Sequence, residues 1–82
     1  MDRSKWQDVS QRLGLRLRDL RNGRQLTQES VAELSDLHRV YYGRLERGEE
    51  NPTLEVLVRL SLALETPLSS LFKNSHELGR TS

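Results

Sequence analysis

The 82-residue chain contains no cysteine, only two prolines, one tryptophan and one phenylalanine. Without cysteine, disulfides and thiolate metal sites are excluded. The two histidines, His38 and His76, lie far apart in the sequence and have no ligand-like spacing around them. No apolar run approaches the ~20 residues of a membrane-spanning helix, and the stretch MDRSKWQDVS lacks the apolar core of a signal peptide. We therefore expect a cytoplasmic protein without metal, cofactor or membrane anchor.

A strong excess of one charge is also missing, because 13 Lys and Arg face 12 Asp and Glu and leave a net charge of +1. The balance is uneven along the chain. Residues 1–48 hold 10 basic and 7 acidic residues, a balance of +3, whereas residues 49–82 hold 3 and 5, a balance of −2. A basic half indicates a nucleic-acid partner, although many neutral surfaces divide in this way by chance.

What the chain does have is helical periodicity. Apolar side chains recur every three or four residues along the chain. This pattern predicts a compact all-α fold of five helices in one domain over residues 1–82, with a core at about 5–73 and a polar tail at 74–82. A chain of this length buries only roughly 60% of its unfolded surface, so a second subunit would help to cover the apolar residues.

The first predicted helix runs from Ser4 or Lys5 to about Arg24, with Ser4 as its N-cap. Its apolar stripe is formed by Trp6, Val9, Leu13, Leu17 and Leu20. Gly14 lies inside this helix at a cost of roughly 1 kcal/mol relative to alanine. We expect this glycine to allow close contact with a neighbouring helix.

Residues 27–48, TQESVAELSDLHRVYYGRLERG, predict two short helices joined by a tight turn. Thr27 is a good N-cap for a helix from Gln28 to Ser35, of which Val31, Ala32 and Leu34 should face inward. Asp36 falls where the turn needs a left-handed residue. A second helix follows over residues 39–47, ends at Gly48, and should bury Tyr42 and Leu45. Such a pair is typical of the helix-turn-helix, whose second helix enters the DNA major groove.

The outer face of the second helix carries the candidate DNA contacts. We expect four positions to meet base edges: Arg39, Val40, Gly43 and Arg44. Arginine can bind O6 and N7 of guanine together, valine can meet a thymine methyl, and glycine allows close approach. Five further residues are placed to meet phosphates: Thr27, Gln28, His38, Tyr41 and Arg47. For Gln28, Arg44 and Arg47 the alternative is an ordinary solvated polar surface. Glu46 points the other way, and we expect it to pair with Arg21 in a structural ion pair.

Beyond Gly48 the sequence EENP reads as a loop, and Thr53 caps a fourth helix. Leu54, Leu57, Leu60 and Leu64 form one stripe on this helix, which Val58 and Leu62 widen. A helix with so wide an apolar face must be covered on two sides. Thr66 and Pro67 are expected to start a short fifth helix.

The segments LRLRDLR (15–21), LTQESVAELS (26–35), YYGRLERG (41–48), NPTLEVLVRLSLAL (51–64) and PLSSLF (67–72) together resemble the phage repressor/Cro-type helix-turn-helix family, also called XRE. The small size resembles restriction–modification controller proteins in particular. The resemblance implies a homodimer that binds double-stranded operator DNA. It also implies a base-reading Arg39, phosphate contacts at Gln28 and Tyr41, and the Arg21–Glu46 pair. The residues that match the family's dimer region are Leu64, Leu68, Leu71 and Phe72.

Three positions depart from the family pattern. Gln25 and Asp36 stand where glycine is usual after a helix, and His38 replaces a small polar residue before the recognition helix. His38 also suggests the hypothesis that its protonation tightens DNA binding at low pH.

These features predict a non-catalytic, sequence-specific transcriptional regulator that binds a pseudo-palindromic operator. Repression would follow from blocking RNA polymerase and activation from contacting it, with the acidic residues Glu49 and Glu50 as one candidate surface. The alternative is a protein-interaction or antitoxin module on the same fold, for which Arg39 and Arg44 would be dispensable.

Overall fold

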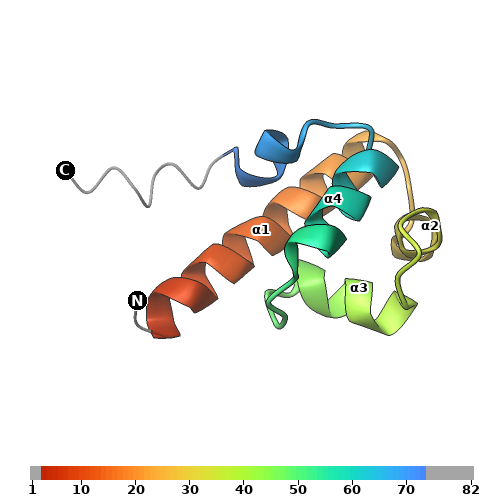
Figure 1. The fold of residues 1–82 in the computed structure, drawn as a ribbon. Coiled ribbons are helices and arrows are strands. Elements are labelled where there is room, and N and C mark those ends of the chain that lie inside the picture. Colours follow the sequence, from red (N-terminus) through yellow and green to blue (C-terminus); the bar gives the residue numbers. More distant parts are fainter. Residues whose placement is uncertain (1–2, 74–82) are drawn as a thin grey trace.

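The computed structural model describes residues 3–73, and these form four α-helices and a short 3-10 helix. Figure 1 shows the long first helix crossing the molecule, with the second and third helices on one side and the fourth helix beside the 3-10 helix. The elements are α1 (Arg3–Gly23), α2 (Gln28–Leu34), α3 (Arg39–Glu46), α4 (Leu54–Ala63) and the 3-10 helix η1 (Leu68–Phe72). The polar tail expected at 74–82 lies outside the described residues, as does His76.

The C-terminal element differs from its prediction, because residues 68–72 form a 3-10 helix and a fifth α-helix is not confirmed. Its N-cap is Pro67, which has no side-chain oxygen, so the expected cap at Thr66 is wrong. A run of five residues is too short to sustain an α-helix by itself, and 3-10 turns are common in such short pieces. Its position is fixed by contact with α1 and α4.

The core is small and aliphatic, as a short chain requires. It is formed by Leu13, Leu17, Val31, Ala32, Tyr42, Leu45, Leu60, Leu64 and Leu71. All four α-helices and η1 contribute at least one of these residues. The periodic spacing therefore identified the buried stripe of each helix correctly near its centre.

At the edges of these stripes the predictions fail. Trp6 is 50% exposed, Leu34 is 61% exposed and Leu54 is 68% exposed. Each of these residues lies at or near an end of its helix. Ser4 is also not a cap, because α1 already begins at Arg3.

Each of the four α-helices is followed, two residues after its last residue, by a residue in the left-handed region. These residues are Gln25 (φ 58°), Asp36 (φ 57°), Gly48 (φ 75°) and Glu65 (φ 51°). After α3, for example, the N–H of Gly48 donates to Leu45 O and the N–H of Glu49 donates to Arg44 O. This pair of bonds is the Schellman motif, which satisfies the last carbonyls of a helix. Left-handed Asp36 was predicted, whereas Glu65 was not.

Gly14 permits a close contact between α1 and α3. A Cβ added there would lie 2.4 Å from Glu46 O and 2.6 Å from Leu45 O. These are backbone atoms at the C-terminal end of α3, so α1 and α3 meet with no side chain between them. The predicted close contact is confirmed, and it fixes the depth at which α3 sits against α1.

None of the helices within residues 3–73 is both long and apolar enough to span a membrane.

Candidate nucleic-acid interface

The eight residues of α3 divide into a buried and an exposed side. Tyr42, Leu45 and Glu46 are buried against the rest of the chain. On the other side the side chains of Arg39, Arg44 and Arg47 are more than half exposed, and Val40 is 49% exposed. A basic, exposed helix face on a rigid support can approach a polyanion.

The start of each helix in this pair is capped by a side chain. Thr27 accepts a hydrogen bond from the backbone N–H of Ser30 at 3.0 Å. His38 caps α3, because its Nδ1 accepts a hydrogen bond from the N–H of Val40 at 3.2 Å. Both residues, expected to meet phosphates, therefore have a structural role in the free protein. His38 Nδ1 is thus occupied by this cap in the free protein.

A buried ion pair holds the helix-turn-helix against α1. Arg21 Nε donates to Glu46 Oε2 at 2.6 Å and Arg21 Nη2 donates to Glu46 Oε1 at 3.0 Å, which is the pair that the sequence predicts. Tyr42 Oη donates to Glu46 Oε2 at 2.6 Å, and Gln28 Nε2 donates to Glu46 Oε1 at 2.9 Å. Arg21 also donates to Leu26 O at 3.0 Å. One carboxylate thus receives donors from α1, α2 and α3.

These contacts shift three pKa values. The hydrogen bond to Glu46 raises the pKa of Arg21, against the opposing effect of burial. Burial raises the pKa of Tyr42, and its hydrogen bond to Glu46 raises it further. For Glu46 burial would raise the pKa, but hydrogen bonds from Arg21, Tyr42 and Gln28 outweigh it and lower the pKa. The group is therefore ionised at neutral pH and serves the framework.

Gln28 was expected at the DNA surface, but its amide N–H₂ faces inward toward Glu46. The side chain is half-buried and lies near Gly43, where an added Cβ would be 3.7 Å from Gln28 Oε1 and 3.5 Å from Arg47 Nη1. Gly43 is consequently covered in the free protein by these two side chains. Sequence reasoning missed this inward position because it depends on the angle between α2 and α3.

Each arginine on the exposed side of α3 has an acidic neighbour. Arg39 Nη1 lies 3.1 Å from Glu29 Oε2 and Arg47 Nε lies 3.2 Å from Glu49 Oε2. Arg44 Nη1 lies 3.7 Å from an oxygen of the Glu50 carboxylate. The sequence analysis did not predict these pairs. The signal that could have found two of them is the sequence RLERGEE, in which acidic residues follow the arginines directly.

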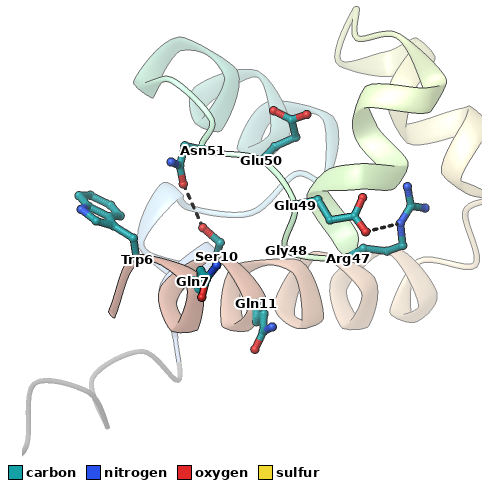
Figure 2. Close-up of a pocket in the computed structure, with 9 residues that line it drawn as sticks. All are labelled: Trp6, Gln7, Ser10, Gln11, Arg47, Gly48, Glu49, Glu50 and Asn51. Atoms are coloured by element: carbon teal, nitrogen blue, oxygen red, sulfur yellow. Dashed lines mark hydrogen bonds and ion pairs between the residues drawn. The ribbon is translucent and has the colours of Figure 1, made fainter. Parts of the chain in front are cut away.

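The loop after α3 is anchored on α1. Figure 2 shows residues 47–51 passing beside the N-terminal half of α1, where they line a pocket together with Trp6 and Ser10. The buried Ser10 Oγ donates to Asn51 Oδ1 at 3.1 Å. Gly48 lies so close to Gln11 that an added Cβ would meet its Cα at 2.9 Å. The loop that carries Glu49 and Glu50 is therefore held at both ends.

Tyr41, a predicted phosphate contact, lies at the edge of the exposed face. It is partly buried against the core. Burial raises the pKa of its hydroxyl, and the negative charge of Glu50 raises it further. The hydroxyl is thus a neutral donor at neutral pH, which suits a phosphate acceptor.

The predicted dimer residues need a correction. Leu64 is 2% exposed and Leu71 is fully buried within one chain, so neither side chain is available to a second subunit. Leu68 and Phe72 are partly buried against the same core. The apolar side chains that face outward on α4 are instead Leu54, Val58 and Leu62, spaced by four residues. The family resemblance placed Leu64 in the dimer region, whereas the structure places it in the core on the same side of α4 as Leu60.

No group of three or more His, Asp or Glu able to hold a metal ion occurs among residues 3–73.

Comparison with known proteins identifies the class to which this architecture belongs. The family model described as "Helix-turn-helix" matches residues 17–71. This span covers the last third of α1, all of α2, α3 and α4, and most of η1. The chain belongs to the helix-turn-helix family of DNA-binding transcriptional regulators.

Within this family the chain is similar to control proteins. It is 44% identical to control protein C.SmaI of Serratia marcescens over 64 residues, which are 78% of this chain and 76% of the relative. It is 40% identical over 68 residues to control protein C.MunI of a Mycoplasma species, covering 82% and 92%. The crystal structure of the restriction-modification controller protein C.AhdI from Aeromonas hydrophila aligns with a TM-score of 0.76 at 42% identity, covering 79% of this chain and 97% of that one.

Proposed function

We propose that this chain is a controller-type transcriptional regulator that acts as a homodimer and reads a pseudo-palindromic operator with α3 in the major groove. The observation that carries the proposal is the two-sided α3, whose buried side is locked to α1 and α2 while its exposed side presents three arginines. An α-helix fits the major groove of B-DNA, where each base pair has its own pattern of donors and acceptors. The role is one of binding and involves no catalysis.

We assign base reading to Arg39, Val40, Gly43 and Arg44. Arg39 is the first residue of α3, the end from which recognition helices contact bases, and its guanidinium can bind guanine O6 and N7. Phosphate contacts are assigned to Thr27, Gln28, His38, Tyr41 and Arg47. Since Gln28 and His38 already serve the framework, Tyr41 and Arg47 are the cleaner tests of phosphate binding.

The homodimer is proposed to form through the outer side of α4. Leu54, Val58 and Leu62 lie on one stripe and leave three large apolar side chains in water. Symmetric contact between two copies would cover this stripe, and a two-fold dimer matches two operator half-sites about 34 Å apart.

The first experiment is an anisotropy titration with DNA from immediately upstream of the protein's own gene. Random DNA of equal length is the competitor, and the salt concentration is varied. Tight binding that survives the competitor, with a stoichiometry of two chains per operator, supports the proposal. Weak binding that is equal for both DNAs would show that only the phosphate contacts operate.

Two substitutions separate base reading from phosphate binding. Arg39→Ala should cost about 1–3 kcal/mol on the operator and relax preference at one base position. Tyr41→Phe removes one hydroxyl and should weaken operator and random DNA by similar factors. Equal losses on both DNAs for Arg39→Ala would disprove its base-reading role. Retained function of an Arg39→Ala, Arg44→Ala variant would favour the protein-interaction module instead.

The dimer surface is tested by a matched pair of aspartates. Leu62→Asp changes a side chain that is 73% exposed and should give a folded monomer in sedimentation experiments. Leu71→Asp places a charge in the core and should prevent folding. A folded Leu62→Asp dimer would move the interface away from the outer side of α4.

If the bound dimer activates transcription, we propose that it does so by contacting RNA polymerase. Glu49 and Glu50, the acidic candidates, are paired with Arg47 and Arg44 in the free protein. A transcription assay with the Glu49→Gln and Glu50→Gln variants tests them directly, because activation lost at unchanged operator occupancy would indicate a polymerase contact.

A further inference from the structure

The exposed side of α3 is less basic than its sequence suggests. Three arginines project from the end of the molecule that would meet DNA, and each has a carboxylate of the same chain within 4.0 Å. One carboxylate comes from the first turn of α2 and two come from the loop after α3. At short range the six charges sum to zero, so a polyanion meets a nearly neutral surface where the sequence places three cations.

These pairs contribute little to folding. In the Arg39–Glu29 pair both side chains are about two-thirds exposed, and exposed ion pairs add little to stability because water and salt screen them. Their positions are nevertheless well defined. Glu29 lies on a helix, while the loop bearing the other two is anchored through Gly48 against Gln11 and Asn51 on Ser10, as Figure 2 shows. The carboxylates therefore stand beside the DNA-facing arginines at fixed places.

A carboxylate beside an arginine affects its two kinds of DNA partner differently. A phosphate is an anion, so it must displace the carboxylate or accept close repulsion from it. Guanine O6 and N7 are neutral acceptors. Arginine has five N–H donors, so Arg39 can keep one bond to Glu29 while it presents two others to a guanine. The carboxylate penalises phosphate binding and at the same time holds the guanidinium for base reading.

We infer that Glu29, Glu49 and Glu50 are specificity-determining residues, which mask the arginines of α3 from phosphates and thereby suppress binding to non-operator DNA. This inference rests on the proposed function, because it concerns the same DNA-binding face. It assigns a role to residues that make no DNA contact of their own.

The experiment measures how tightly four variants of the full chain bind random and operator DNA, and how each affinity depends on salt concentration. The variants are Glu29→Gln, Glu49→Gln, Glu50→Gln and the triple variant. Glutamine keeps the size of the side chain and removes the charge. The matched control is Glu55→Gln, which removes an exposed carboxylate paired with Arg59 on α4, with no α3 arginine as its partner, and changes the net charge by the same amount as each single variant. Circular dichroism and melting curves verify that each variant folds.

Each single substitution should raise affinity for random DNA about two- to fivefold, and the triple variant roughly tenfold or more. The slope of log K against log salt on random DNA should steepen by about 0.9 for each arginine that gains a phosphate. Operator affinity should rise less, so the ratio of operator to random binding falls. For Glu29→Gln, operator affinity should stay level or drop, since Arg39 loses its support.

The inference is overturned if the three substitutions act like Glu55→Gln, shifting both DNAs by one common factor, or if random-DNA affinity and its salt slope do not change. A wild-type protein without operator preference would instead refute the proposed function. In that case the masking of the arginines is tested only by the slope of log K against log salt on random DNA. An unchanged slope in the triple variant would refute the masking.

Discussion

Gly14 gives the sharpest test of how this fold positions its recognition helix. In an isolated helix Gly14→Ala would stabilise the protein by about 1 kcal/mol, because glycine is a poor helix former. In this structure the new methyl group would lie 2.4 Å and 2.6 Å from two backbone oxygens of α3. No side chain can rotate away to relieve this overlap, so α1 and α3 must separate.

The size of the effect follows from that separation. Overpacking of a well-packed core costs about 1–3 kcal/mol. Opening a gap of about 0.5–1 Å also loses a quarter to a half of the dispersion energy of the atoms that line it. After the gain in helix propensity, we expect Gly14→Ala to destabilise the fold by about 1–2 kcal/mol, which lowers Tm by roughly 5–15 °C.

Gly23 provides a control in the same helix. A Cβ added at Gly23 meets nothing within 4 Å, so Gly23→Ala should be neutral or stabilising by up to about 1 kcal/mol. Both variants are compared by thermal and urea unfolding at one fixed protein concentration, because a dimer's stability depends on concentration. The reasoning fails if Gly14→Ala is as stable as Gly23→Ala. Operator affinity, measured well below Tm, should fall only for Gly14→Ala, since only it displaces α3.

Three further predictions concern the framework. Glu46→Gln should lose about 3 kcal/mol of stability at neutral pH by leaving Arg21 without a charged partner. Hydrogen bonds lower the pKa of Glu46 in the folded protein, so the unfolded wild type binds more protons just below the ordinary glutamate pKa of about 4.3, and the free energy of unfolding falls as the pH drops through that window. Urea unfolding at several pH values should show a smaller loss of stability at acid pH in Glu46→Gln than in the wild type. An equal loss in both proteins would mean that another group causes the acid destabilisation. Gln25→Gly should raise stability by up to about 1 kcal/mol, as glycine adopts its left-handed conformation without strain, and a lower Tm would contradict this. Thr27→Ala should cost about 0.5–2 kcal/mol through loss of the α2 cap, measured by urea unfolding with Thr27→Ser as the tolerated control.

Much of the fold follows from local rules that the sequence displays. Helix starts at Thr27 and Thr53 were predictable because a threonine side chain accepts a bond from the N–H three residues later. The close contact at Gly14 was predictable because glycine destabilises a helix interior, so its presence there indicates that a neighbouring helix needs the space. The Arg21–Glu46 pair was predictable from the family resemblance together with the inward side of α3.

The misplaced residues share a different cause, since their environment depends on how helices are arranged in space. Leu62 and Leu64 are both leucines two positions apart, and the packing of α4 against η1 and α2 decides which one is buried. Gln28 looks like a surface residue until the angle between α2 and α3 brings its amide within 2.9 Å of Glu46. Glu29 was missed for the same reason, because it meets Arg39 across the turn between α2 and α3, ten residues apart in the sequence.

Gly43 makes this regulator a convenient starting point for changing which DNA sequence is read. The buried side of α3 holds the helix against α1 and α2, and its residues can be left unchanged. Gly43 has no side chain with which to contact DNA. A Cβ there would meet only the ends of two long side chains at 3.5 Å and 3.7 Å, which is ordinary van der Waals contact. Alanine can therefore be introduced at position 43 without disturbing the contact between α3 and α1. Under the proposed function this position faces base edges, so variants at this single residue should differ in operator preference on an unchanged scaffold.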